Sequence, residues 1–254
     1  MLGTEMEKNR IQVKHASGDA DYDIAISACH AAFTKPVVVV GDDTDVLLLL
    51  QHHFTPDLHE TIYFQTSTKL INVSTLQKSL DPALGCSLLF IHGLSGCDTT
   101  SRPYGIGKLS AIGKYQDLKE FAEVFMKVEQ NQQDIEEAGN KALATLYGHT
   151  KDLNLERAAK FTEKVVSRSA YLPPEWLPPT SDAGRFHSRR VYLQVQAWIG
   201  NNLKAEEWGW DLCTTQRGSI LKPHRMNQDA APTSLLQIVR CNCGGKCDKN
   251  TCSC

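Results

Sequence analysis

The chain has 254 residues, of which 41% are hydrophobic and 22% charged, and its formal net charge is −2 at pH 7. Such a composition is typical of globular proteins, and the length suffices for one large domain or a smaller domain with appendages. The balanced charge excludes a general attraction to nucleic acid, so nucleic-acid binding would need a local basic patch. Because no apolar run reaches membrane-span length and the N-terminus lacks a signal-peptide core, we expect a soluble intracellular protein without a membrane partner.

Strand and helix patterns alternate over the first 116 residues. Strands are expected at residues 11–15, 37–40, 62–64, 70–73 and 88–91. Helices are expected at residues 24–33, 46–54 and 73–80. Ser74 is the expected cap of the last of these helices. Residues 37–40 are all valine, which predicts a strand covered on both faces. This alternation favours an α/β domain with a parallel sheet.

From Gln116 onward the pattern changes to helix. Apolar residues recur at a spacing of about 3.6, which predicts helices at residues 118–128, 132–147, 155–166 and 185–199. Residues 171–179 include four prolines and predict a rigid connector. The stretch from 208 to 239 reads as irregular or weakly β. We therefore divide the chain into residues 1–116, a helical extension at 117–170, a Pro-rich and Trp-containing region at 171–240, and a tail at 241–254.

Acidic residues follow two of the expected strands. Asp42, Asp43 and Asp45 come directly after residues 37–40. Asp98 follows the strand expected at 88–91. Sites in α/β sheets lie beyond the carboxyl ends of the strands, so these acids are expected to meet there. Clustered carboxylates repel one another unless a cation neutralises them, which indicates a divalent-metal site. The alternative is structural, because aspartate is common in turns and helix caps.

Two segments carry basic residues suited to phosphate. Gly105-Ile-Gly107 predicts a tight hairpin that opens a helix and exposes backbone N–H groups, and Lys108 adds a positive charge beside them. Residues 186–190 form a basic cluster on an expected helix. Each segment also has a structural alternative, which is a plain turn for the hairpin and a solvated helix face for the cluster.

These motifs, in this order, resemble those of the flap-endonuclease branch of the PIN-like nucleases. Asp19-Ala-Asp21 matches the family's acidic pair that opens a helix, and Asp43-Thr-Asp45 matches the pair after the next strand. Gly96-Cys-Asp98 matches a later acidic segment, although Thr99 stands where the family usually has tyrosine. The Gly-Ile-Gly hairpin matches one that holds the DNA backbone. The resemblance covers about residues 11–116.

The resemblance implies a metal-dependent, structure-selective nuclease that acts on DNA or RNA phosphodiesters. It assigns catalysis and metal ligation to Asp19, Asp21, Asp43, Asp45 and Asp98. It assigns nucleic-acid binding to Gly105, Ile106, Gly107 and Lys108. Two Mg²⁺ or Mn²⁺ ions about 4 Å apart would activate water and stabilise the leaving oxygen. On this basis we expect a nuclear rather than a cytoplasmic protein.

The family departs from this chain at the N-terminus. It has a strand ending in a further metal-binding aspartate, tens of residues before the first acidic pair. No aspartate precedes Asp19 here, so the chain looks incomplete relative to the family, and we expect weak or no cleavage from it. The alternative function is a non-catalytic nucleic-acid-binding protein that uses the hairpin and the tail. A haloacid-dehalogenase-type phosphatase is disfavoured, because only its Asp43-Thr-Asp45 motif is matched.

Five cysteines crowd into the last fourteen residues with the spacing C-x-C-x3-C-x4-C-x-C: Cys241, Cys243, Cys247, Cys252 and Cys254. Intracellular clusters of this kind are more often metal ligands than disulfides, and thiolates suit Zn²⁺. The paired cysteines resemble the tesmin-like CXC motif, although the spacing differs. The alternative is a disordered tail that binds metal opportunistically.

Overall fold

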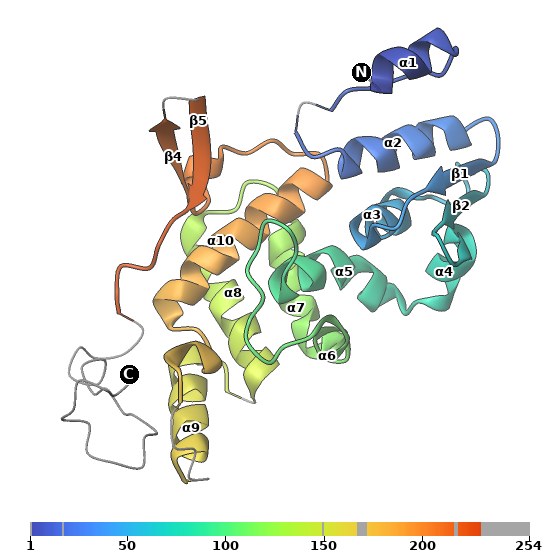
Figure 1. Cartoon of the computed structure of the whole chain (residues 1–254). Coiled ribbons are helices and arrows are strands. Elements are labelled where there is room, and N and C mark those ends of the chain that lie inside the picture. Colours follow the sequence, from blue (N-terminus) through green and yellow to red (C-terminus); the bar gives the residue numbers. More distant parts are fainter. Residues whose placement is uncertain (1, 17, 149, 167–171, 216–217, 230–254) are drawn as a thin grey trace, which may run out of the picture. The chain divides into compact units, whose positions relative to one another are not determined.

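The structure, a computed structural model, describes residues 2–16, 18–148, 150–166, 172–215 and 218–229 (Figure 1). Within these residues the chain is mixed α/β, with ten α-helices and two small sheets. It separates into two compact units, residues 1–89 and residues 90–254. The division lies inside helix α5 (Pro82–Ser95), well before the composition change at Gln116. The order of elements agrees with the sequence in that mixed strands and helices come first and mainly helices follow.

The first unit contains a three-stranded sheet in the order β1 (Val37–Val40), β2 (Ile62–Gln65) and β3 (Leu70–Asn72). Strands β1 and β2 are parallel, with Val38 opposite Tyr63, whereas β2 and β3 are antiparallel. The unit also holds four helices: α1 (Leu2–Lys8), α2 (Asp21–Ala32), α3 (Thr44–His53) and α4 (Val73–Ser79). The sheet is thus mixed, and only the β1–β2 pair has the parallel pairing expected from the sequence.

Strand β1 is covered on one face only. Val39 is buried at 9% exposure, whereas Val38 and Val40 are 58% and 78% exposed. The expectation of a strand covered on both faces is therefore wrong. A run of identical valines has no polar alternation, so the sequence carries no signal of which face meets water.

Residues 88–91, expected as a strand, belong to α5, and this expectation is wrong. The Asp81 carboxylate accepts the backbone N–H groups of Ala83 at 2.9 Å and Leu84 at 3.3 Å, and Pro82 opens the helix. An aspartate followed by proline is a strong helix-start signal, because proline fits the first helical position without losing a hydrogen bond. A short apolar run fits a buried helix as well as a buried strand.

Two smaller expectations also fail in the first unit. Residues 11–15 form no strand. Helix α4 is capped by Asn72, whose side chain accepts the backbone N–H of Thr75 at 2.9 Å, and not by Ser74. Asparagine is as good a cap as serine, and the cap position depends on where β3 ends.

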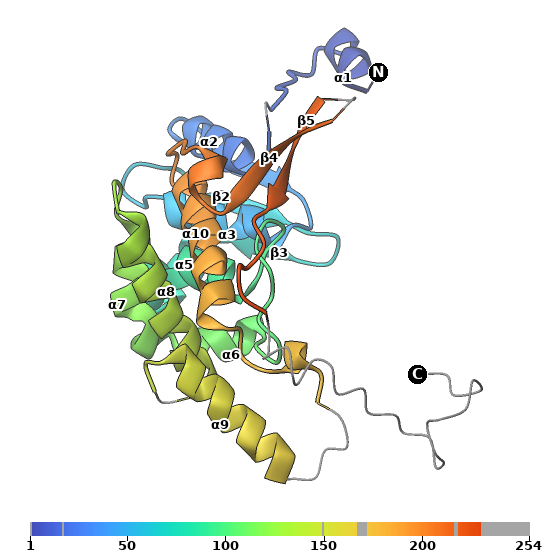
Figure 2. The same cartoon turned by 90° about the vertical axis from the view of Figure 1, so that its left-hand side faces the viewer.

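The second unit is mainly helical (Figure 2). Its helices after α5 are α6 (Lys108–Ile112), α7 (Tyr115–Met126), α8 (Gln132–Tyr147), α9 (Leu153–Val166) and α10 (Ser181–Trp198). Helix α10 packs along α8, and α7 packs against both. A side chain on Gly139 would overlap that of Ser188, so this close approach of α8 and α10 requires a glycine.

The aromatic core of this unit lies where α7 meets α10. The buried ring of Tyr192 packs 6.2 Å from Phe125 and 4.4 Å from Trp208, and its hydroxyl donates to the Lys127 carbonyl at 3.0 Å. Trp198 is also buried, whereas Trp176 is 48% exposed. Tyrosine tolerates such burial when its hydroxyl finds a partner, as that of Tyr192 does.

Two short segments complete the second unit. The Pro-rich connector contains a single 3₁₀ turn (Pro174–Trp176), as expected of a segment where proline excludes a regular helix. Strands β4 (Trp210–Thr215) and β5 (Gly218–Pro223) form an antiparallel hairpin in the stretch expected to be weakly β. Among the described residues, no helix is both long and apolar enough to cross a membrane.

Candidate metal centre

Three aspartates of the first unit lie close together at the start of two helices. Asp21 is the first residue of α2, Asp43 is the N-cap of α3, and Asp45 lies in the first turn of α3. One carboxylate oxygen from each lies within 4.8 Å of those of the other two. Asp43 is exposed, and the other two are partly buried. All three are metal ligands expected from the sequence.

Local structure explains why these side chains meet. Helices α2 and α3 pack against each other, and β1 delivers the chain directly into the start of α3. The Asp43 carboxylate accepts the Asp45 backbone N–H at 2.9 Å, which fixes the orientation of the acid and starts the helix. The positive ends of two helix dipoles partly offset the repulsion among the carboxylates.

The neighbouring acids have structural partners. The Asp19 carboxylate accepts the Asp21 backbone N–H at 3.2 Å, and it is not one of the three ligands of the cluster. Asp42 accepts the backbone N–H of Ser67 at 2.8 Å, which ties the end of β1 to the β2–β3 turn. Asp23 forms an ion pair with Lys14 at 2.8 Å. Asp42 therefore has a turn contact and Asp23 an ion pair, whereas metal ligation by Asp19 stays a prediction.

The donor set of the cluster suits a hard divalent cation. Mg²⁺ and Mn²⁺ prefer oxygen ligands, and Mg²⁺ keeps several of its waters when carboxylates bind it. Asp43 can serve as cap and as ligand together, because a carboxylate has two oxygens. The residues that would hold the ion are therefore Asp21, Asp43 and Asp45.

Asp98 belongs to the second unit, and its place in the metal centre stays a prediction. It is exposed in the turn after α5, where Cys97 and Thr100 pair as a short bridge. The Thr100 hydroxyl donates to the Gly93 carbonyl at 2.7 Å and fastens this turn to the helix. Because Asp98 follows a helix, the strand-end reasoning that first placed it beside the other acids does not apply to it.

The Gly105–Gly107 segment opens helix α6, as expected. Gly105 has a φ of +74°, which favours glycine, and Gly107 is the N-cap. The Lys108 ammonium lies 3.0 and 3.1 Å from the two ring nitrogens of His92, a buried residue of α5. His92 therefore has a structural contact, and phosphate binding by Lys108 stays a prediction.

All five tail cysteines, and with them the expected zinc site, lie outside the described residues. The cysteines that the structure describes form no disulfide with one another: Cys29, Cys86, Cys97 and Cys213. The chain matches no protein-family model, no curated protein and no solved structure. Its own residues therefore have to support any functional assignment.

The second unit holds a further feature that was not expected from the sequence, a cavity with three arginines in its wall: Arg102, Arg157 and Arg190. The only sequence signal was the basic cluster at residues 186–190, which contributes one of them. The other two lie on separate segments of the chain, so no local motif joins the three.

Proposed function

We propose that this protein is a metal-dependent phosphodiesterase of the PIN-like, flap-endonuclease type. The observation that supports this is the group of three carboxylates from the starts of α2 and α3, with oxygens within 4.8 Å of one another. A nuclease of this class needs such a group of oxygen ligands to hold its divalent ions. The order of the acidic motifs in the sequence supports the same class.

Asp21, Asp43 and Asp45 act as the ligands in this proposal. A divalent ion held by these residues would supply Lewis acidity toward a phosphodiester and would help to activate water. The exposed Asp43 faces solvent, from which the phosphate arrives, while the half-buried Asp21 and Asp45 are held by their helices. The capping bond from the Asp45 backbone N–H keeps the Asp43 carboxylate oriented before the ion binds.

The family resemblance adds further residues to the proposal. It assigns metal ligation to Asp19 and to Asp98 as well, and it assigns the Gly105–Lys108 segment to the nucleic-acid backbone. Backbone contacts of this kind position the substrate without reading its sequence. The proposed substrate is therefore a DNA or RNA strand recognised by its structure.

The test is cleavage of a labelled flap substrate in Mg²⁺ and in Mn²⁺. Cleavage by the wild type should be weak, should need Mg²⁺ or Mn²⁺ and should stop in EDTA, and Asp45→Asn should remove it. The matched control is Asp42→Asn, which removes the same charge from a neighbouring residue that holds Ser67 instead of the cluster. Binding of the flap without cutting by any of the proteins would replace the nuclease proposal with a non-catalytic nucleic-acid-binding function.

A further inference from the structure

The second unit contains a cavity of about 620 Å³ that the proposed nuclease function does not use. Its wall is built from the loop at residues 101–104, helices α8, α9 and α10, the Pro-rich segment and the residues after β5. The volume is that of an ordinary small-molecule site. Apolar side chains, including Leu143 and Phe186, line part of it.

Three guanidinium groups line this cavity, and each donates to a backbone carbonyl. Arg102 donates to Ile106 at 3.1 Å and Arg190 to Gly209 at 3.3 Å. Arg157 donates to Pro178. The carbonyl partners of Arg102 and Arg190 orient these guanidinium groups without neutralising them, and arginine stays charged in proteins. Within the part of the chain that the structure describes, neither Arg102 nor Arg190 forms an ion pair with a carboxylate.

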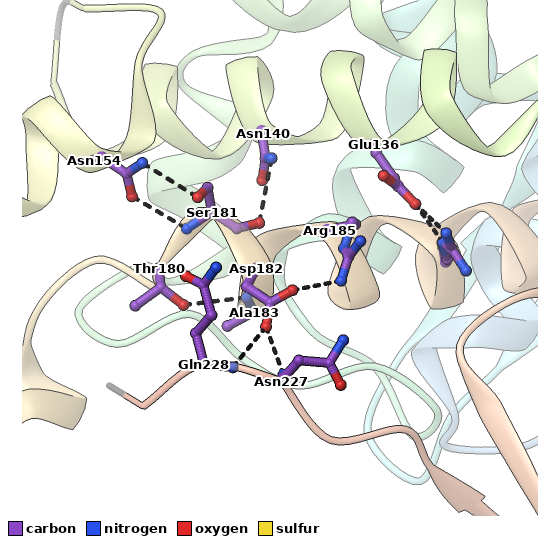
Figure 3. A network of polar contacts seen from close by, with 11 residues as sticks. Glu136, Asn140, Asn154, Thr180, Ser181, Asp182, Ala183, Arg185, Asn227 and Gln228 are labelled. Carbon is purple, nitrogen blue, oxygen red and sulfur yellow. Dashed lines mark hydrogen bonds and ion pairs between the residues drawn. The ribbon is translucent and has the colours of Figure 1, made fainter. Parts of the chain in front are cut away.

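The arginines of α10 that do not line the cavity are paired differently. Arg185 forms an ion pair with Asp182 at 2.5 Å (Figure 3). Arg189 donates to Glu136 on α8 at 2.6 Å. Arg190 follows Arg189 directly, yet it lines the cavity and donates to the Gly209 carbonyl. Burial lowers the pKa of Arg190 and of Arg157, because the charged form of each side chain loses contact with water there.

The cavity is held in shape by polar contacts. The Asp182 carboxylate accepts the backbone N–H groups of Asn227 at 2.6 Å and Gln228 at 3.1 Å, which fastens the segment after β5 to the start of α10 (Figure 3). That segment contributes His224 and Met226 to the wall. A site whose frame is fixed in advance binds its ligand at a lower entropic cost.

His187 fixes the other side of the cavity. Its Nε2 lies 3.0 Å from the Leu94 carbonyl, which can only accept, so Nε2 is the donor. Its Nδ1 then accepts from the Ser101 hydroxyl at 3.2 Å, which ties the loop that carries Arg102 to α10. Among the described lining residues, the only acid is the exposed Glu175. The charge of the wall is therefore positive.

We propose that this cavity binds a phosphate monoester, with Arg102, Arg157 and Arg190 as its anion ligands. Guanidinium groups match phosphate oxygens with two parallel hydrogen bonds, which favours phosphate over a smaller anion. The Tyr104 ring lines the cavity and stacks on Trp176 with centroids 5.7 Å apart and planes tilted by 7°. An aromatic ring held in place by stacking offers a surface on which a base or sugar attached to the phosphate can pack. A free 5′-mononucleotide and the 5′-phosphorylated end of a strand share this chemistry.

The proposal does not rest on the acidic cluster of the first unit, and its test is run in EDTA. Calorimetric titrations of the full chain would compare adenosine 5′-monophosphate, adenosine and succinate. We expect the monophosphate to bind and the other two not to bind. Equal binding of adenosine, or equal binding of succinate, would overturn the assignment, as would no binding of the monophosphate at millimolar concentration.

Replacing single arginines tests whether the phosphate binds at this wall. Arg102→Gln and Arg190→Gln should each weaken monophosphate binding about tenfold or more, because each removes a charge-assisted hydrogen bond. Arg102 is exposed, so its replacement is not expected to disturb folding. Arg225→Gln is the matched control, since this exposed arginine lies outside the wall and its loss should change affinity by less than about twofold. An equal effect of Arg225→Gln would indicate non-specific attraction and overturn the proposal.

The two sources of the phosphate are separated by two dinucleotides. A thymidine dinucleotide with a 5′-phosphate should bind and the same dinucleotide without it should not, if strand ends are the ligand. If the free mononucleotide binds and both dinucleotides fail, the phosphate monoester assignment stands with a small molecule as its source.

Discussion

The carboxylate of Asp43 accepts the backbone N–H of Asp45 at 2.9 Å, and the side chains of both residues belong to the cluster with Asp21. One aspartate thus begins helix α3 and presents a metal ligand. These two roles depend on different properties of the side chain. Capping needs an acceptor oxygen, whereas cation binding needs the negative charge.

Substitutions at Asp43 should therefore separate stability from metal binding. Asp43→Ser keeps a good cap and should leave the free energy of unfolding in EDTA nearly unchanged, whereas Asp43→Ala should lower it by about 1 kcal/mol. Urea denaturation followed by circular dichroism measures both variants. Equal stability of the serine and alanine variants would show that the capping bond contributes nothing.

Burial of His187 should make the second unit sensitive to acid. Burial lowers the pKa of this imidazole to about 4, although the hydrogen bond to Leu94 acts in the opposite direction. The unfolded chain, with a histidine pKa of about 6.5, then binds a proton that the folded chain excludes, so stability falls as the pH drops from 7 toward 4. The loss from this residue between pH 7 and pH 5 is about 2 kcal/mol.

The measurement is the free energy of unfolding at several pH values for the wild type and for His187→Gln, which cannot titrate. The wild type should lose more stability than the variant over this range. His52 in the first unit also has its pKa lowered to about 4, mainly by burial, and it contributes equally to both proteins. Parallel pH curves for the two proteins would refute the role of His187.

Gly96 and Gly105 both have positive φ angles, but their surroundings differ. At Gly96 the φ is +109° and a Cβ would lie 2.8 Å from the Arg102 Cα, whereas at Gly105 no atom lies within 4 Å. Gly105→Ala should cost only the backbone strain of about 1 kcal/mol, and Gly96→Ala should cost clearly more because backbone must also move. Thermal unfolding of both variants tests this order, and a smaller loss for Gly96→Ala would contradict it.

The cysteine tail should bind zinc through thiolates. Metal analysis of the purified, reduced chain should find at least one zinc, and replacing Cys241 and Cys243 with serine should release it. The affinity for zinc should fall as the pH is lowered, because each cysteine must lose a proton to coordinate. A wild-type chain without zinc would favour the disordered alternative for the tail.

The helical half of the fold was readable from the sequence because its apolar periodicity is long and regular. Helix α8 has the bounds expected for it, and α10 differs mainly by an earlier start, set by its Thr180 cap. The secondary structure of short apolar runs was harder to predict. Residues 88–91 form a helix whose start is set by Asp81 and Pro82, a signal that lies outside the run itself. Periodicity cannot separate such a run from a strand.

The candidate site was predictable only where its residues are close in sequence. Asp43 and Asp45 share one helix start, and Asp21 joins them because α2 packs on α3. The arginines of the second-unit cavity come from separate segments, and only the fold brings them to one wall. No local pattern could have indicated that wall, because each arginine alone reads as an ordinary surface charge.

The central claim is that Asp21, Asp43 and Asp45 hold a divalent ion, and titration with Mn²⁺ followed by electron paramagnetic resonance tests it most directly. The wild type should bind Mn²⁺ at a site from which Mg²⁺ displaces it. Asp43→Ser, folded and capped, should lose that site, while Asp42→Asn should keep it. Unchanged Mn²⁺ binding by Asp43→Ser would contradict the claim, because it would place the ion elsewhere in the chain.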